Sequence, residues 1–84
     1  MGSKKDKLYN AAKNSPSNIR FQDLCNLAEE VGFKLRKIKG SHRIYKHPNL
    51  PEMMTFQPDK GDSSKAKAYQ VRQLLSCIED NDLL

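Results

Sequence analysis

Residues 37–48 concentrate the side chains of this chain that could do chemistry. This stretch holds both histidines, His42 and His47, together with the most basic run of the sequence. A histidine side chain has an unperturbed pKa close to neutral, so it can give or take a proton under physiological conditions. Neighbouring cations can stabilise negative charge that develops beside it. The pattern therefore predicts proton transfer on an anionic ligand, with Lys37, Lys39 and Arg43 close to His42.

Other catalytic and metal-binding patterns find little support in the sequence. The chain offers only Cys25, His42, His47 and Cys77 as soft metal ligands, with no Cys-x₂-Cys pair among them. It contains no paired catalytic carboxylates, no phosphate-binding glycine loop and no nucleophile elbow. We therefore expect no metal and no cofactor. Both cysteines fall in apolar helical patterns, which favours buried, reduced thiols in a cytoplasmic protein.

Length and charge restrict the architecture and the partners. Eighty-four residues leave room for one small core, and we expect a domain over residues 19–84 preceded by an extension over residues 1–18. The formal net charge of +5 favours a polyanionic partner, either nucleic acid or an acidic protein. No apolar run approaches the roughly 18–20 residues of a membrane span, and no signal-peptide pattern opens the sequence. We expect no membrane association.

Hydrophobic periodicity predicts an α+β fold. A helical stripe covers residues 21–31 and a second covers residues 65–78, while a short helix is possible at residues 5–13. Between the two main helices the pattern predicts three strands, at residues 33–39, 42–47 and 53–57. Because short connections join these strands, we expect a three-stranded antiparallel sheet with the helices on one face.

The predicted hairpin turns at Gly40 and Ser41. Glycine supplies the positive φ that a type II′ turn needs at its first central position, so Lys39 should pair with His42. Counting outward from this turn places alternate residues on opposite faces. One face should pack on the helices and carry Phe33, Leu35, Lys37, Lys39, His42, Ile44 and Lys46. The open face should then carry Lys34, Arg36, Ile38, Arg43, Tyr45 and His47.

Several segments resemble a known family. They are Phe21-Gln22-Asp23-Leu24, Val31-Gly32-Phe33, the run from Lys39 to Pro48 that contains Gly40-Ser41-His42, and the segment from Lys65 to Leu75. Over about residues 18–78 the chain is similar to the HicA toxins of bacterial toxin–antitoxin pairs. The resemblance implies the fold of a double-stranded-RNA-binding domain, and a ribonuclease that cuts mRNA with the histidine of Gly-Ser-His, here His42. It also implies a HicB-like antitoxin that blocks the site.

The chain departs from the commoner branch of that family after the third strand. That branch has Pro-x-His or a similar sequence there, whereas this chain has Phe56-Gln57-Pro58-Asp59. A second catalytic histidine at that place is therefore absent, and the partner that completes proton transfer with His42 stays open.

RNA supplies its own nucleophile, the 2′-hydroxyl, so cleavage requires a base, an acid and cations for the developing charge. We expect His42 to act as base or acid, with Gly40 as the turn residue. Tyr45 could stack a base. The expected substrate-binding residues are Lys34, Arg36, Lys37, Lys39, Ser41, Arg43, Tyr45 and His47. Lys65, Lys67 and Arg72 extend this cationic surface and would position RNA through its phosphates.

A non-catalytic RNA-binding module of the same fold is the alternative, with His42 only a contact. Each cation could equally be a solvated surface residue, and each of Ser41, Tyr45 and His47 has an ordinary structural interpretation. We expect oligomers only through the antitoxin, if at all.

Overall fold

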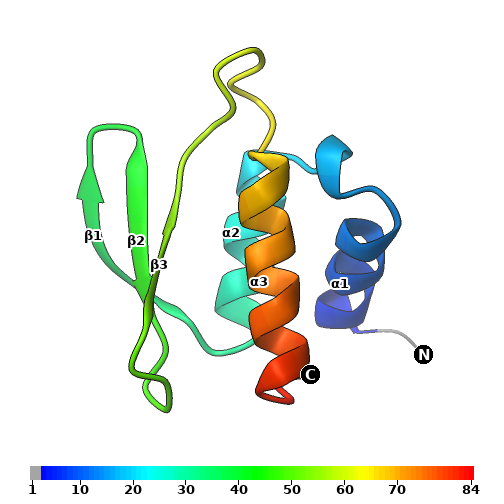
Figure 1. Ribbon diagram of the computed structural model, residues 1–84, viewed down its shortest axis with the longest axis vertical. Coiled ribbons are helices and arrows are strands. Elements are labelled where there is room, and N and C mark those ends of the chain that lie inside the picture. The colour runs from blue at the N-terminus through cyan, green and yellow to red at the C-terminus, as the bar shows by residue number, and fades with distance from the viewer. Residues whose placement is uncertain (1–2) are drawn as a thin grey trace.

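The computed structural model describes residues 3–84, so the first two residues of the predicted extension lie outside it. Residues 3–84 form three α-helices and a three-stranded sheet, which are labelled in Figure 1. The elements are α1 (Lys4–Asn14), a short 3₁₀ turn (Pro16–Asn18), α2 (Phe21–Glu30), β1 (Lys34–Lys39), β2 (His42–Lys46), β3 (Met53–Phe56) and α3 (Ala68–Asp80). Each predicted strand is found within one residue of its expected ends.

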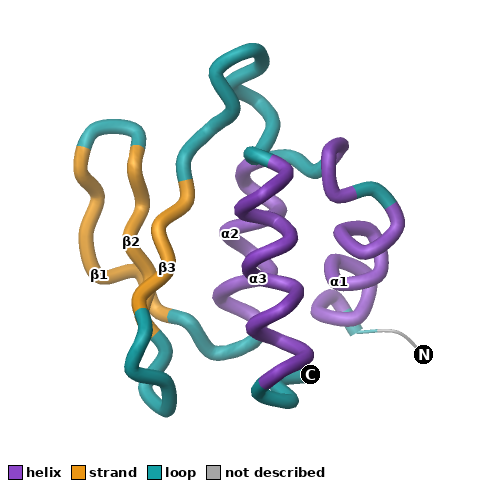
Figure 2. The backbone as a smooth tube through the Cα atoms, viewed as in Figure 1, coloured by secondary structure: helices purple, strands orange, loops and turns teal. Residues whose placement is uncertain are grey.

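The sheet is antiparallel, in the order β1-β2-β3, and all three helices lie on one side of it (Figure 2). This arrangement is the predicted α+β layout of a double-stranded-RNA-binding domain. Strand β3 lies nearest to α3, whereas β1 is the outer strand and is exposed along its whole length. Among the described residues, no helix combines the length and apolar character needed to cross a membrane.

The core forms where α2 and α3 meet the inner side of the sheet. The apolar stripes predicted for the two helices are buried, and Tyr45 and Phe56 cover them from the sheet. The largest fully buried side chains are Tyr45, Phe56, Leu24, Leu27, Leu74, Ile78, Val71 and Cys25. A chain of this length has little stability to spare, so each of these contacts matters.

Helix α2 ends at the predicted glycine. Gly32 has a φ of +106°, and its N–H donates to the Glu29 carbonyl while Phe33 N–H donates to the Ala28 carbonyl. These two bonds form a Schellman motif, which satisfies carbonyls that the helix end would leave unpaired.

Helix α3 begins three residues later than predicted. Lys65 and Ala66 are extended, and they form isolated antiparallel bridges with Arg20 and Pro58. Ala66 N–H donates to the Ile19 carbonyl at 2.8 Å, so this backbone satisfies its hydrogen bonds across the chain instead of within a helix. The expected helical start at residue 65 is wrong for this reason.

Helix α1 confirms the short helix predicted in the N-terminal extension. Ala12 is buried in the same core cluster as α2 and α3. The Tyr9 hydroxyl donates to Glu79 Oε2 at 2.6 Å, and Lys13 forms an ion pair with the same carboxylate. The boundary at residue 18 stays a prediction.

Candidate nucleic-acid interface and active site

The hairpin between β1 and β2 has the predicted turn but an unexpected irregularity. Lys39 pairs with His42 as expected, and Gly40 has a φ of +62°. Further along β1 the register shifts between Leu35 and Lys37, so Arg36 forms a β-bulge. A bulge adds one residue to one strand, and every residue beyond it changes face.

The predicted assignment of faces holds for Phe33 and Lys34 but is wrong for β2 and for the part of β1 beyond the bulge. Arg43, Tyr45 and His47 point to the helices, and the residues of β2 between them point to solvent. The bulge at Arg36 reconciles this alternation with Phe33, which is also buried on the helix side. Because of this bulge, Lys34 lies on the open face of the sheet together with Lys37 and Lys39.

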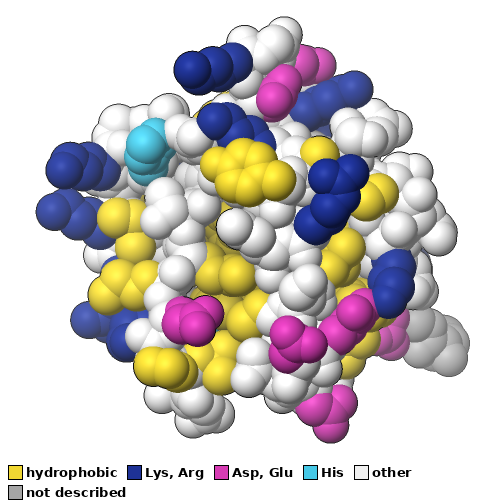
Figure 3. All heavy atoms as spheres, in the orientation of Figure 1, with side chains coloured by type: hydrophobic (Ala, Val, Ile, Leu, Met, Phe, Trp, Pro, Cys, Tyr) yellow, Lys and Arg dark blue, Asp and Glu magenta, His cyan; other side chains and the backbone are white. Residues whose placement is uncertain are grey.

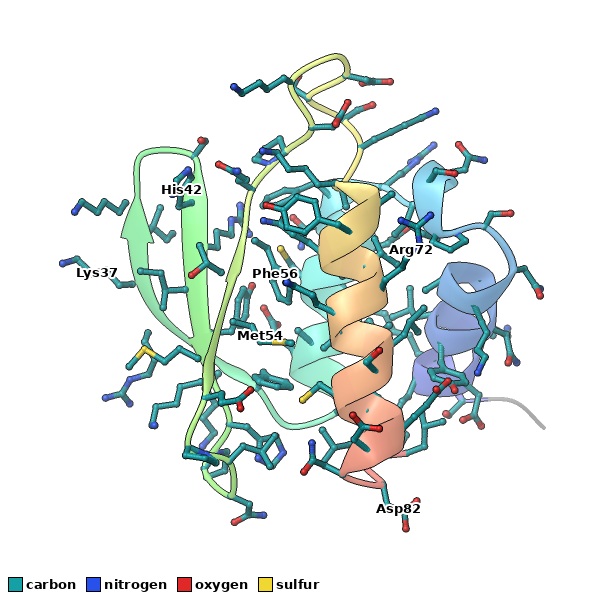
Figure 4. All side chains as sticks on the ribbon, viewed as in Figure 1. Lys37, His42, Met54, Phe56, Arg72 and Asp82 are labelled. Carbon is teal, nitrogen blue, oxygen red and sulfur yellow. The ribbon has the colours of Figure 1, made fainter. Side chains whose placement is uncertain are left out.

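His42 therefore lies on the open side of the sheet, where it is exposed. The pairings Lys34–Lys46, Lys37–Ile44 and Lys39–His42 place four lysines on the same face as this histidine. Figure 4 shows His42 near the free end of the hairpin and Lys37 extending away from the helices. The arrangement can bring an anion to an imidazole that water and ligand both reach.

Tyr45 is not available to stack a base. Its side chain is fully buried, and its hydroxyl donates to Glu29 Oε2 at 3.1 Å. Burial raises the pKa of Tyr45, and the nearby Cys25 raises it further, so the phenol stays neutral. It contacts Phe56 with a ring-centroid separation of 5.6 Å. Tyr45 is a core residue.

His47 is also withdrawn from the substrate surface. It is 5 % exposed, and its ring packs edge-on against Phe33. Asn49 N–H donates to Nδ1 at 3.1 Å, so Nε2 carries the proton and donates to the Val31 carbonyl at 3.1 Å. The imidazole thus joins the end of β2 to the end of α2.

Arg43 is half-buried on the helix side of β2 instead of on the open face. Its guanidinium lies 5.3 Å from the centroid of the Phe21 ring, a cation–π contact between the sheet and α2. The remaining predicted contacts, Ser41 in the turn and Arg36 at the bulge, are exposed. Arg72 is exposed on α3, whereas Lys65 and Lys67 are half-buried.

A groove of about 820 Å³ runs between β3 and α3 and reaches His42. At the end near the hairpin its lining includes His42, Gln57, Tyr69 and Arg72, and at the opposite end Glu52 and Asp80. Figure 4 places His42 and Arg72 toward the same end of the molecule, across β3 from each other. Tyr69 was missed by the sequence reasoning. Its position outside the apolar stripe of α3 was the available signal.

The two ends of this face differ in charge. In Figure 3, lysines and arginines gather along the outer side of the sheet, whereas acidic side chains gather around the C-terminal end of α3. Phosphates are attracted to the first region and repelled from the second. The surface therefore favours an anionic ligand at the His42 end of the groove.

The cysteines and histidines do not form a metal-binding cluster in the described part of the chain, residues 3–84, where no three ligand side chains converge. Cys25 and Cys77 are free thiols, the first fully buried and the second half-buried. Burial raises the pKa of both thiols, so both are protonated at neutral pH.

The fold and the surface together define a small α+β domain with one helix-covered face and one basic open face. Residues 21–79 match the family described as HicA toxin of bacterial toxin-antitoxin. The chain belongs to this family and is the toxin of a toxin–antitoxin pair, so its expected partner is an antitoxin. No curated protein and no solved structure gave a match.

Proposed function

We propose that this toxin is an endoribonuclease that cuts mRNA in the cytoplasm without a metal, with His42 as general acid or general base. The observation that supports the proposal most directly is the position of His42. It is an exposed imidazole on a face with four lysines, at the mouth of a groove. Histidine is suited to proton transfer near neutral pH.

The reaction proceeds by attack of the 2′-oxygen on the adjacent phosphorus. A base removes the 2′-hydroxyl proton, the bond from phosphorus to the 5′-oxygen breaks, and an acid protonates that leaving oxygen. The products are a 2′,3′-cyclic phosphate and a free 5′-hydroxyl. Lys37 and Lys39 stabilise the negative charge on the phosphorane oxygens, because they share the open face with His42. Lys34, Arg36 and Ser41 remain contacts for neighbouring phosphates.

Inhibition follows from the same surface. A HicB-like antitoxin that places acidic groups over the open face would neutralise its lysines and cover His42. Such complementarity accelerates association and selects the partner. We expect toxin and antitoxin to form a complex whose stability falls as salt rises.

The test compares wild type with His42→Ala on a long single-stranded RNA in the presence of EDTA. We expect wild type to cleave and the variant to lose at least a hundredfold in rate, which is the usual worth of a positioned acid or base. Circular dichroism should show an unchanged fold, since His42 is exposed. Lys7→Gln, at an exposed cation on α1, is the matched control and should cleave normally.

Equal cleavage by wild type and His42→Ala, or cleavage abolished by EDTA, would overturn the mechanism. RNA binding without any cleavage would instead support the alternative, a non-catalytic RNA-binding module. In cells, His42→Ala should relieve growth inhibition while keeping its affinity for the antitoxin. Undiminished toxicity would exclude His42 as the catalytic residue.

A further inference from the structure

Tyr69 is an aromatic side chain in the groove that the proposed mechanism does not use. Tyr69 lies in the first turn of α3, and 52 % of its surface is exposed. Within residues 3–84 the other two tyrosines are half-buried or buried. An exposed aromatic ring offers a flat apolar face on which a nucleobase can stack. Tyr69 also lines the groove that contains His42.

A buried polar residue holds the two walls of this groove together. Gln70 is 4 % exposed, and its Oε1 accepts a hydrogen bond from Gln57 N–H at 2.9 Å, which joins the end of β3 to α3. Its Nε2 donates to the Tyr69 hydroxyl at 3.3 Å. Both polar atoms of the Gln70 side chain therefore form hydrogen bonds at this end of the groove. The position of the Tyr69 ring relative to β3 is therefore built into the fold.

A cation accompanies the aromatic ring. Arg72 follows Tyr69 by three residues, so both project from the same side of α3, and both line the groove. Across β3 lies His42 (Figure 4), and Gln57, the residue that follows β3, also lines the groove. A ring, a guanidinium and an imidazole in one groove match the alternation of base and phosphate in a single strand.

We propose that this end of the groove is a subsite for single-stranded RNA, in which one unpaired base stacks on Tyr69 and an adjoining phosphate pairs with Arg72. The inference rests on the proposed function, since it takes RNA as the ligand and leads its backbone toward His42. Stacking tolerates any base, so the subsite selects unpaired over paired nucleotides more than it selects sequence. The acidic opposite end, with Glu52 and Asp80, confines the strand to the Tyr69 end.

The absence of tryptophan from the sequence provides a direct probe of this contact. Tyr69→Trp, made together with His42→Ala to prevent cleavage, places a single indole in the proposed subsite. The ligands are an RNA octamer and an abasic octamer with the same number of phosphates. We expect the RNA to quench the indole fluorescence saturably and the abasic strand to leave it unchanged, because only a base can stack.

Two further variants in the His42→Ala background separate stacking from charge. Tyr69→Leu should weaken RNA binding about tenfold and leave abasic binding unaltered, in keeping with the worth of one base–aromatic stack. Arg72→Gln should weaken both ligands and lower the salt dependence by about one phosphate contact. Lys7→Gln should change neither.

The outcomes distinguish the subsite from the catalytic proposal. Cleavage by wild type together with equal quenching by both octamers, or no quenching by either, would overturn the subsite alone. Saturable, base-dependent quenching with no cleavage by wild type would support the subsite and overturn the ribonuclease. If Tyr69→Leu weakened only the binding of the antitoxin, the groove would belong to a protein partner and the RNA subsite would be refuted.

Discussion

Replacing Gly32 with alanine should destabilise the protein through one defined contact. A methyl group at this position would lie 2.7 Å from Nε2 of His47 and 3.1 Å from its neighbouring carbon. The imidazole cannot yield easily, because Nε2 donates to the Val31 carbonyl and Nδ1 accepts from Asn49. We expect the variant to displace the ring and break at least the first of these hydrogen bonds.

The magnitude combines a backbone and a side-chain contribution. A non-glycine residue with a positive φ costs about 1–2 kcal/mol, and Gly32 has a φ of +106°. Loss of the buried hydrogen bond of His47 adds about 1 kcal/mol. The expected loss is therefore about 2–3 kcal/mol, which corresponds to a decrease in Tm of about 8–24 °C for a domain of this size.

Gly40→Ala is the matched control for the backbone contribution. Gly40 also has a positive φ, +62°, but a methyl group there would meet nothing within 4 Å. This variant should lose only about 1–2 kcal/mol. Urea denaturation followed by circular dichroism would measure both free energies of unfolding, with His47→Ala and Gly32→Ala/His47→Ala completing a double-mutant cycle.

The double-mutant cycle separates the steric clash with His47 from the backbone strain at position 32. With the imidazole removed, Gly32→Ala should cost no more than Gly40→Ala, because only the backbone contribution remains. If Gly32→Ala cost the same with and without His47, or no more than Gly40→Ala in the wild-type background, the steric argument would be refuted.

Three further predictions concern side chains whose roles the fold decides. Arg43→Gln should lower the free energy of unfolding by about 0.5–1 kcal/mol, through loss of the contact with Phe21, and leave RNA affinity unchanged; weaker RNA binding at unchanged stability would show that Arg43 contacts RNA. Tyr45→Phe should cost about 1 kcal/mol in urea denaturation and retain full cleavage, since the ring stays buried; reduced cleavage by the folded variant would contradict a core role. The hydrogen bond from Lys13 lowers the pKa of Glu79 below its ordinary 4.5, so the stability that this pair contributes is present above that value and lost as the pH falls through the lowered pKa. The difference in Tm between wild type and Glu79→Gln should therefore shrink in acid, and a constant difference down to pH 2 would contradict the pairing.

The element order could be predicted because each element carries its own local signal. The stripes of α2 and α3 follow the helical period, Gly32 ends α2, and Gly40 places the turn that pairs Lys39 with His42. These features depend on residues close in sequence, and the structure confirms them.

The two faces of the sheet were assigned wrongly beyond the bulge because the register between β1 and β2 is set by tertiary packing. The bulge at Arg36 lets Phe33 and Tyr45 be buried on the same side of the sheet, and no residue type in β1 marks the extra position. Tyr45 and His47 were therefore assigned to a surface that the fold does not give them. The same correction places His42 on the open side, where the catalytic proposal requires it.

The sequence was sufficient to identify Tyr69 as an exposed aromatic residue, but it was not sufficient to place Tyr69 in the groove beside β3. An aromatic residue outside the buried stripe of a helix is visible in the pattern, whereas its approach to β3 depends on Gln70 and on the path of the loop before α3. Contacts between elements far apart in sequence are not encoded in local periodicity.

The bulge in β1 also has a consequence for how this surface can evolve. If β1 kept its length but lost the bulge, Arg36 would lie opposite Tyr45, Lys34 would turn toward the helices and Leu35 would come to the open face, with no change in composition. Deleting Arg36 would instead leave Leu35 opposite Tyr45 and Lys34 opposite Lys46, so every other side chain would keep its face. Substitutions alter this surface one side chain at a time, whereas a shift of register that removes the bulge exchanges a charged position for an apolar one at once. Among related toxins, gain or loss of this bulge would therefore be a route by which partner preference diverges while the fold is kept.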